Sequence, residues 1–146
     1  EILMKGHGEH GILREDFPGG WQNDKRNAFI EQERTPEEKE IFNYLRTLLQ
    51  WRKQSDAIQN GQLKHFVPEN NIYVYNRKSS RESVLVILNN SNQTKEIDLS
   101  RFHEVLTGYQ SATDIITGKQ LTTLNKITLS ENSSLVLKLN PPAEAD

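Results

Sequence analysis

The sequence predicts a mainly β protein: an antiparallel two-sheet β-sandwich preceded by a loop and one long helix. Three observations favour this fold class. Residues 62–139 contain about seven or eight short apolar segments separated by turn-forming residues at regular spacing, as in sandwich domains. Residues 35–54 carry apolar side chains at helical spacing. Residues 1–34 follow neither period, and five of the chain's eight glycines lie among the first 20 residues.

The first 34 residues predict a long loop with a function of its own. Phe17-Pro18-Gly19-Gly20 is a turn sequence, because proline presets φ and paired glycines allow positive φ. A connection of roughly 30 residues without its own periodicity is usually functional or disordered in a compact domain. The aromatic and charged side chains of this segment argue against a flexible linker, so we expect the functional alternative.

The helix predicted over residues 35–54 has clear start signals. Thr35 is a good N-cap, Pro36 suits the first helical position, and Glu38 completes a Thr-x-x-Glu capping box. Ile41, Leu45 and Leu48 recur at helical spacing, and neighbouring aromatic and aliphatic residues widen this apolar stripe. So wide a stripe predicts burial against a larger partner.

The strand region predicts one hairpin with particular clarity. Leu63–Val67 and Ile72–Tyr75 flank a turn at Asn70-Asn71. Val84–Leu88 is a continuous apolar run, which suits a strand covered on both faces. In the last strand, Leu135, Leu137 and Leu139 alternate with Ser134, Val136 and Lys138, and residues 141–146 form a polar tail.

Composition excludes several classes of protein. The 146 residues are too few for a complete eight-stranded β/α barrel, which needs roughly 250. With 18 basic and 20 acidic side chains, the chain lacks the electrostatic signature of nucleic-acid binding. It has no apolar run long enough to span a membrane and no cysteine. No phosphate loop, dinucleotide fingerprint or HExxH pattern occurs, so no cofactor is predicted.

Arg14, Asp16 and Trp21 are the candidate substrate-binding residues. Carboxylates accept hydrogen bonds from sugar hydroxyls, and an indole can stack on the apolar face of a sugar ring. From the residues alone, however, a structural pair between an arginine and a carboxylate beside a core tryptophan is the more common arrangement.

Three other groups favour ordinary structural roles. His7, Glu9 and His10 could suggest a metal site, but the glycines within and beside this group leave ligand geometry undefined, so no metal is predicted. Glu37, Glu38 and Glu40 start the helix, where capping and the helix dipole account for them. Aromatic residues favour strands, so a carbohydrate platform is the lesser alternative for Phe66, Tyr73 and Tyr75.

Several runs of residues resemble a known enzyme family. Glu1–Met4, Arg14–Trp21 and Asp24–Phe29 together resemble the end of the catalytic barrel in cyclomaltodextrinases and neopullulanases of the α-amylase superfamily, particularly the Bacteroidetes type. Leu49–Lys53 resembles the last barrel helix, and Asp56 stands where the family's exit motif has proline. The runs 66–70, 74–75 and 86–90 resemble the start of the family's C-terminal β-domain. The most specific element is Arg-x-Asp-Phe-Pro-Gly-Gly-Trp.

This resemblance implies a domain organisation. Residues 1–60 would be the terminal strand, loop and helix of a truncated (β/α)8 barrel, residues 61–140 the C-terminal β-sandwich of α-amylase type, and 141–146 a tail. The partner would be the rest of the catalytic barrel in the parent chain. The resemblance also implies a bacterial, periplasmic location, and the exposed strand and helix make a dimer conceivable.

The resemblance further implies hydrolysis of α-1,4-glucans by a retaining mechanism with two aspartates and a glutamate. Those three carboxylates belong to earlier barrel strands, so no catalytic residue is assigned in this chain. Arg14, Asp16 and Trp21 would belong to a loop that lines the glucan cleft. We therefore expect the C-terminal fragment of a hydrolase acting on cyclodextrins, maltooligosaccharides or pullulan, with a stabilising β-domain. The alternatives are a non-catalytic α-glucan-binding module or an unrelated interaction sandwich.

Overall fold

The computed structural model describes residues 8–9 and 16–142. The predicted barrel strand Glu1–Met4 lies outside the described residues, as does the end of the predicted tail. The chain forms two compact units, residues 1–49 and 50–146, and each is described by itself.

The first unit contains the short 3-10 helix η1 (Glu31–Glu33) and most of α2 (Pro36–Arg52). The predicted capping box is confirmed at the start of α2. The backbone N–H of Glu38 donates to Oγ1 of Thr35 at 3.3 Å, and the N–H of Thr35 donates to Oε2 of Glu38 at 3.0 Å. The helix ends at Arg52, two residues before the expected end at residue 54.

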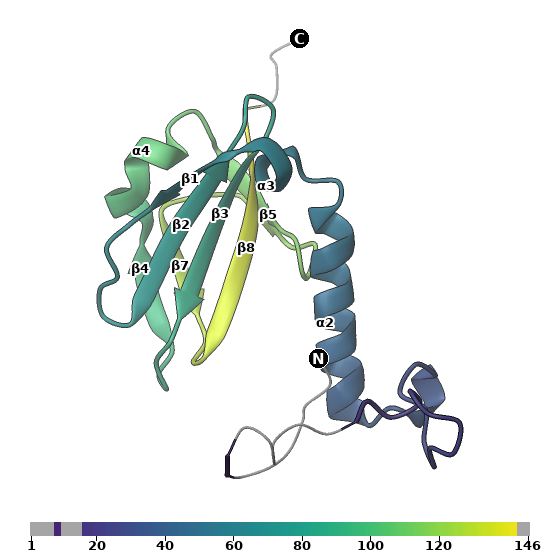
Figure 1. Ribbon diagram of the computed structural model, residues 1–146. Helices are drawn as coiled ribbons and strands as arrows, with labels where there is room; N and C mark the ends of the chain where they lie inside the picture. The colour runs from purple at the N-terminus through teal and green to yellow at the C-terminus, as the bar shows by residue number, and fades with distance from the viewer. Residues whose placement is uncertain (1–7, 10–15, 143–146) are drawn as a thin grey trace. The chain divides into compact units, whose positions relative to one another are not determined.

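The second unit begins with the short helix α3 (Asp56–Asn60) and continues into eight strands (Figure 1). The strands are β1 (Gln62–His65), β2 (Ile72–Lys78), β3 (Ser83–Asn89), β4 (Lys95–Asp98), β5 (Ser111–Asp114), β6 (Gln120–Leu121), β7 (Lys126–Leu129) and β8 (Ser133–Asn140). They form a six-stranded sheet in the order β1-β2-β3-β8-β5-β6 and a two-stranded sheet of β4 and β7. All described strand pairs are antiparallel, which confirms the predicted two-sheet sandwich.

The predicted hairpin is formed by β1 and β2. Its turn places Asn70 at φ 52° and Asn71 at φ 63°, in the left-handed region that asparagine tolerates better than most residues. Gln62 pairs with Lys78 and His65 with Tyr75 across the two strands. The chain leaves regular β1 geometry earlier than expected, although the N–H of Phe66 still donates to the carbonyl of Val74 at 3.0 Å.

The hydrophobic core lies between the two sheets. Alternate residues of the central strands point into it, among them Leu85 and Ile87 from β3 and Leu137 from β8. The smaller sheet contributes Ile97 and Ile127. The continuous apolar run of β3 is buried from Val84 to Ile87, so side chains on both of its faces are covered, as predicted.

Two short helices between β4 and β5 were not expected from the sequence. The 3-10 helix η2 (Leu99–Phe102) leads directly into α4 (His103–Leu106), visible beside β1 in Figure 1. They bury Leu99, Phe102, Val105 and Leu106 in the core. The periodicity of the segment is strand-like up to Leu99, and Asp98 then caps η2 by accepting a hydrogen bond from the N–H of Ser100 at 2.9 Å. Nowhere in the described residues is there a helix with the length and hydropathy to cross a membrane.

Candidate functional site

Two of the three predicted substrate-binding residues, Asp16 and Trp21, lie in the described part of the N-terminal loop, whereas Arg14 lies outside it. Both described side chains are exposed, and Trp21 retains 68% of its accessible surface. Asp24 fixes the backbone here, since its Oδ2 accepts hydrogen bonds from the N–H of Gly19 at 2.7 Å and of Trp21 at 3.1 Å. An exposed indole on a fixed turn can stack on the apolar face of a sugar ring.

The turn before Trp21 requires a glycine. Gly19 has φ +96°, and a Cβ at this position would lie 2.3 Å from Oδ1 of Asn27. Close by, the rings of Phe17 and Phe29 pack with centroids 4.8 Å apart, although Phe29 remains 65% exposed. The loop therefore combines a defined backbone with several exposed aromatic side chains.

Arg26 and Glu38 clamp this loop to the first turn of α2. The Arg26 guanidinium donates to both carboxylate oxygens of Glu38, at 2.6 and 3.0 Å. The hydrogen bond to Glu38 raises the pKa of Arg26 above its ordinary value, against the opposing effect of burial. Glu38 is only 7% exposed, so its predicted capping role is joined by a bidentate ion pair that the sequence did not reveal.

Arg34 holds the other end of the loop. Its Nε donates to the carbonyl of Ala28 at 2.6 Å, and its terminal nitrogen donates to the carbonyl of Phe29 at 3.0 Å. The guanidinium also lies 3.5 Å from the ring centroid of Phe42, in a cation–π contact. Asp24, Arg26 and Arg34 thus have structural partners, and sugar binding by Asp16 and Trp21 stays a prediction.

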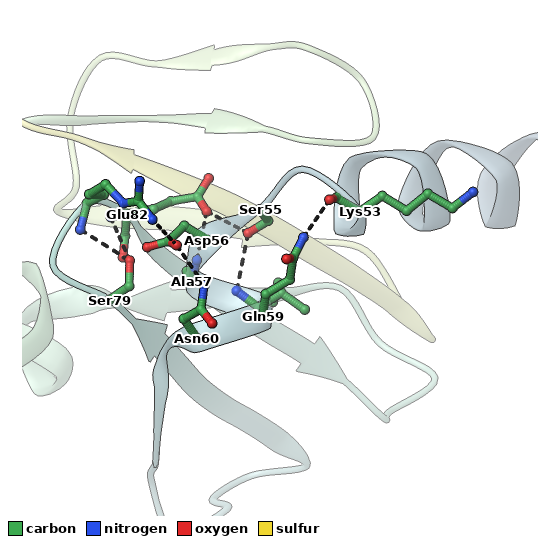
Figure 2. A network of polar contacts seen from close by, with 10 residues as sticks. Lys53, Ser55, Asp56, Ala57, Gln59, Asn60, Ser79 and Glu82 are labelled. Atoms are coloured by element: carbon green, nitrogen blue, oxygen red, sulfur yellow. Dashed lines mark hydrogen bonds and ion pairs between the residues drawn. The ribbon is translucent and has the colours of Figure 1, made fainter.

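A second polar cluster joins α3 to the turn between β2 and β3, and we call it the joint. Figure 2 shows its members Ser55, Asp56, Ser79 and Glu82 around α3. Arg77 and Arg81 also belong to it through their hydrogen bonds to α3. The Glu82 carboxylate accepts hydrogen bonds from Oγ of Ser55 at 2.6 Å and from the N–H of Ala57 at 3.0 Å. Lys138 from β8 lies 3.5 Å from the same carboxylate. Burial opposes ionisation, but these donors and Lys138 together hold the pKa of Glu82 below its usual range.

Asp56 and Arg77 complete the joint from either end of α3. Hydrogen bonds from Ser79, Asn60 and Arg81 lower the pKa of Asp56 to about 2. Arg77 donates to the carbonyls of Ala57, Ile58 and Gly61 at 3.2, 3.0 and 2.7 Å, which satisfies the C-terminal end of α3. A Cβ at Gly61 would lie 2.2 Å from the carbonyl oxygen of Ala57, so only glycine fits there.

The chemistry of the joint is structural. Each of its carboxylates is already occupied by hydrogen-bond donors from the same cluster, which leaves neither poised as a general base or nucleophile. Within residues 8–9 and 16–142, no three His, Asp or Glu side chains are grouped to hold a metal ion. His7 and His10, the histidines weighed as ligands, lie outside these ranges.

One face of the six-stranded sheet points away from the core, and we call it the outer face; it is lined by Tyr73, Tyr75, Val84, Val86, Leu88 and Val136. The rings of Tyr73 and Tyr75 lie with centroids 5.7 Å apart. Phe66, the third aromatic residue weighed for a carbohydrate platform, packs instead against Phe102 beneath the sheet, with centroids 4.8 Å apart. The outer face is thus apolar and aromatic over three adjacent strands.

A cleft of about 400 Å³ lies in the second unit, between the η2–α4 segment and the stretch that joins β6 to β7. Its polar side chains include Gln110, Thr122, Thr123 and Asn125, and its apolar ones include Leu106 and Leu124. The sequence analysis did not identify this cleft, because its two walls are about 20 residues apart in the chain and neither carries a recognised motif. The only local signal was the polar run Thr122-Thr123 beside Asn125.

Comparison with protein families and solved structures gives a consistent result. Residues 63–138 match the family described as the cyclo-malto-dextrinase C-terminal domain. These residues are more than half of the chain, and they contain all the strands from β2 to β7 with most of β1 and β8.

Several solved structures share the fold. An α-amylase from Geobacillus thermoleovorans complexed with acarbose is 18% identical with a TM-score of 0.63, over 86% of this chain and 27% of its own. An Anoxybacillus α-amylase is 16% identical with a TM-score of 0.61, over 87% and 27%. AmyP in complex with maltotriose is 14% identical with a TM-score of 0.65, over 75% and 22%. The chain therefore spans about a quarter of the length of these proteins.

Proposed function

The chain belongs to the cyclo-malto-dextrinase C-terminal domain family, and we propose that it is the C-terminal part of a glycoside hydrolase that acts on α-1,4-glucans. Cyclodextrins, maltooligosaccharides and pullulan are the proposed substrates of the parent enzyme. In this proposal residues 1–60 complete a (β/α)8 barrel, residues 61–140 form the appended sandwich, and the catalytic carboxylates lie outside this chain. The resemblance of the N-terminal runs to the cyclomaltodextrinase and neopullulanase barrel supports this division.

The proposed role of the sandwich is to stabilise the catalytic barrel. The observation that carries this proposal is the half-buried part of the outer face, where Tyr73, Tyr75 and Leu88 keep exposed apolar surface on the side of the sheet opposite the core. The valines of the same face are already buried. Burying such surface against a partner contributes roughly 25 cal/mol per Å². The solved structures that share the fold are about four times longer than their matched part, so the barrel of the same chain is the proposed partner.

Further parts of the proposal concern the role of the N-terminal loop, the cellular location of the protein and its oligomeric state. Asp16 and Trp21, with Arg14, are proposed to line the glucan cleft of the assembled enzyme, and the exposure of the Trp21 indole supports this role. We further propose a bacterial periplasmic location and allow for a dimer, in keeping with the resemblance.

The 146-residue chain is expected to release no reducing sugar from maltoheptaose or β-cyclodextrin. The reason is that no described carboxylate is placed as a nucleophile or acid–base pair of the kind that retaining glycosidases need. A reducing-end assay on the purified chain measures this, with a characterised α-amylase as the positive control. Turnover above the buffer blank would contradict the non-catalytic assignment.

Sequencing upstream of Glu1 should reveal barrel strands followed by Asp, Glu and Asp, and their absence would overturn the hydrolase proposal.

Leu88→Lys is expected to lower the melting temperature of the full-length enzyme by several degrees more than that of the 146-residue chain. A lysine on the outer face would be desolvated only where the barrel covers it, because in the chain alone its ammonium group can reach water. Thermal melts of both proteins, with and without the substitution, measure the difference.

The matched control is Thr128→Lys, which introduces the same charge at an exposed position of β7. This control is expected to change both melting temperatures alike. Equal effects of Leu88→Lys in the two proteins would show that the barrel does not cover the outer face.

A further inference from the structure

The cleft beside α4 has the composition of a site for an uncharged, hydroxyl-rich ligand. No Asp, Glu, Lys or Arg is among the described residues that line it. The polar side chains are amides and hydroxyls, together with the imidazole of His103, whose Nδ1 lies 3.2 Å from the carbonyl oxygen of Ser100. Amides and hydroxyls both donate and accept hydrogen bonds, as sugar hydroxyls do. A charged ligand would find no carboxylate, ammonium or guanidinium group in this lining, whereas a neutral polyol would find several hydrogen-bond partners.

Four of these polar side chains are available to a ligand. The side chains of Gln110, Thr122, Thr123 and Asn125 make no hydrogen bond to any described residue. The backbone beneath them is nevertheless fixed, since the carbonyl of Asn125 accepts a hydrogen bond from the N–H of Leu99 at 2.8 Å. All four residues line the cleft and are exposed, so their hydrogen-bonding groups can reach a ligand or water.

The cleft also has an apolar component of the kind that carbohydrate sites use. Leu106 is buried, Leu124 and Tyr109 are half-buried, and all three belong to or pack against the hydrophobic core. Tyr109 is further held by a cation–π contact, with Nζ of Lys78 at 5.6 Å from its ring centroid. A pyranose ring has an apolar C–H face and a polar rim, and the cleft offers both kinds of surface.

We propose that this cleft binds a short stretch of neutral saccharide, and that the saccharide is an α-1,4-glucan. The choice of α-glucan rests on the proposed function, whereas the choice of a neutral saccharide rests on the lining itself. The volume of about 400 Å³ falls within the range of sites that bind small molecules, roughly 300–1,000 Å³. In the parent enzyme, the cleft would hold substrate chains on the sandwich.

Titration of the 146-residue chain with maltotriose, followed by amide NMR spectra, tests the proposal. We expect saturable shifts at the amides of Gln110, Thr123 and Asn125, with a dissociation constant on the order of millimolar, because a shallow site with few polar contacts supplies little net binding energy. Triglycine, a zwitterion of zero net charge, serves as the comparison ligand and is expected to cause no saturable shift.

Two variants of the cleft sharpen the test. The double variant Gln110→Ala with Asn125→Ala is expected to weaken maltotriose binding at least tenfold. Thr123→Val, which removes a hydroxyl at almost constant volume, should weaken it less. Asn90→Ala changes the same residue type at an exposed position in the loop after β3, and it should leave binding unchanged. The amide spectra also report whether each variant is folded.

The possible outcomes are distinct. Absence of saturable shifts at tens of millimolar maltotriose would overturn the proposal, as would equally tight binding of triglycine or unaltered binding by the folded double variant. The melting and hydrolysis experiments above do not involve the cleft. The sandwich can therefore stabilise the barrel even if the cleft binds no saccharide, and the cleft can bind saccharide even if the sandwich does not stabilise the barrel.

Discussion

Replacing Asn89 with aspartate is expected to destabilise the chain by about 3–5 kcal/mol at neutral pH, the cost of a buried charge without a compensating partner. Asn89 is 2% exposed at the end of β3. Its side-chain nitrogen donates to the carbonyls of Gln93, Leu129 and Ser130 at 2.8, 3.3 and 2.7 Å. A carboxylate would instead direct negative charge at these three carbonyl oxygens.

The contacts of Asn89 explain why so large an effect is expected from one atom. The residue ties the end of β3, in the larger sheet, to the end of β7, in the smaller sheet. Its Oδ1 accepts hydrogen bonds from the N–H and Oγ of Ser91 at 3.1 and 2.7 Å, which closes the turn towards β4. The amide accepts on one side and donates on the other, whereas an ionised aspartate loses the donor half.

The destabilisation should shrink as the pH falls. Burial and the facing carbonyls would raise the pKa of the new carboxyl above its unfolded value of about 3.9. The folded state would then bind more protons than the unfolded state, so the free energy of unfolding decreases as the pH rises through this range. Below about pH 3.9 the protonated acid can again donate a hydrogen bond, and the deficit relative to the wild-type chain should be smallest.

Urea unfolding of the wild-type chain and Asn89→Asp at pH 7 and at acidic pH measures this difference. Asn92→Asp is the matched control, because it introduces the same charge at an exposed position of the adjacent turn. The control is expected to change stability by less than about 0.5 kcal/mol. If Asn89→Asp loses little free energy of unfolding, or if its loss does not depend on pH, the amide of Asn89 does not bridge the sheets.

Local patterns in the sequence predicted the elements whose contacts are local. The capping box of Thr35 and Glu38 spans three residues, and the Asn70-Asn71 turn specifies the hairpin through its own backbone conformation. The alternation of leucines in β8 identified its core face because side chains alternate along any strand. These features depend on residues that are close together in the chain, so periodicity and turn chemistry were sufficient to predict them.

Features that depend on distant residues were not predicted. Glu82 and Ser55 are 27 residues apart, and Asn89 and Ser130 are 41 apart, so no window of the sequence contains both partners. The sequence analysis does not predict the short helix α3, although Ser55 caps it by accepting a hydrogen bond from the N–H of Ile58 at 3.3 Å. The cleft beside α4 arises where two loops meet, and loop sequences carry weaker patterns than strands.

Replacing Glu82 with alanine is the second substitution with a large expected effect, a loss of about 2–4 kcal/mol at neutral pH. Removal of the carboxylate leaves the hydroxyl of Ser55 and the N–H of Ala57 without their acceptor, and both residues are almost fully buried. It also removes the partner of Lys138. The joint would then no longer fix α3 to the β2–β3 turn.

The loss of stability in Glu82→Ala should also narrow in acid, but for a different reason, because here the shifted carboxyl belongs to the wild-type chain and its pKa is lowered rather than raised. Because the folded pKa of Glu82 lies below its unfolded value, its carboxylate contributes stability above an unfolded pKa of about 4.3. That contribution is lost as the pH falls through the lower, folded pKa. The difference in the free energy of unfolding between the wild-type chain and Glu82→Ala should therefore be largest at pH 7 and should become smaller in acid. Asp56, with its pKa of about 2, remains ionised through most of this range and isolates the effect of Glu82.

Chemical unfolding across this pH range, with Glu131→Ala as control, distinguishes the loss of the Glu82 contacts in the joint from the loss of one negative charge. Glu131 is an exposed carboxylate in the turn between β7 and β8, and its removal changes the net charge by the same amount. If both variants lose equal stability, or if the loss in Glu82→Ala does not narrow in acid, the joint carboxylate is not what secures α3. If only Glu82→Ala is destabilised, the link between the helical segment and the sandwich depends on a single buried carboxylate.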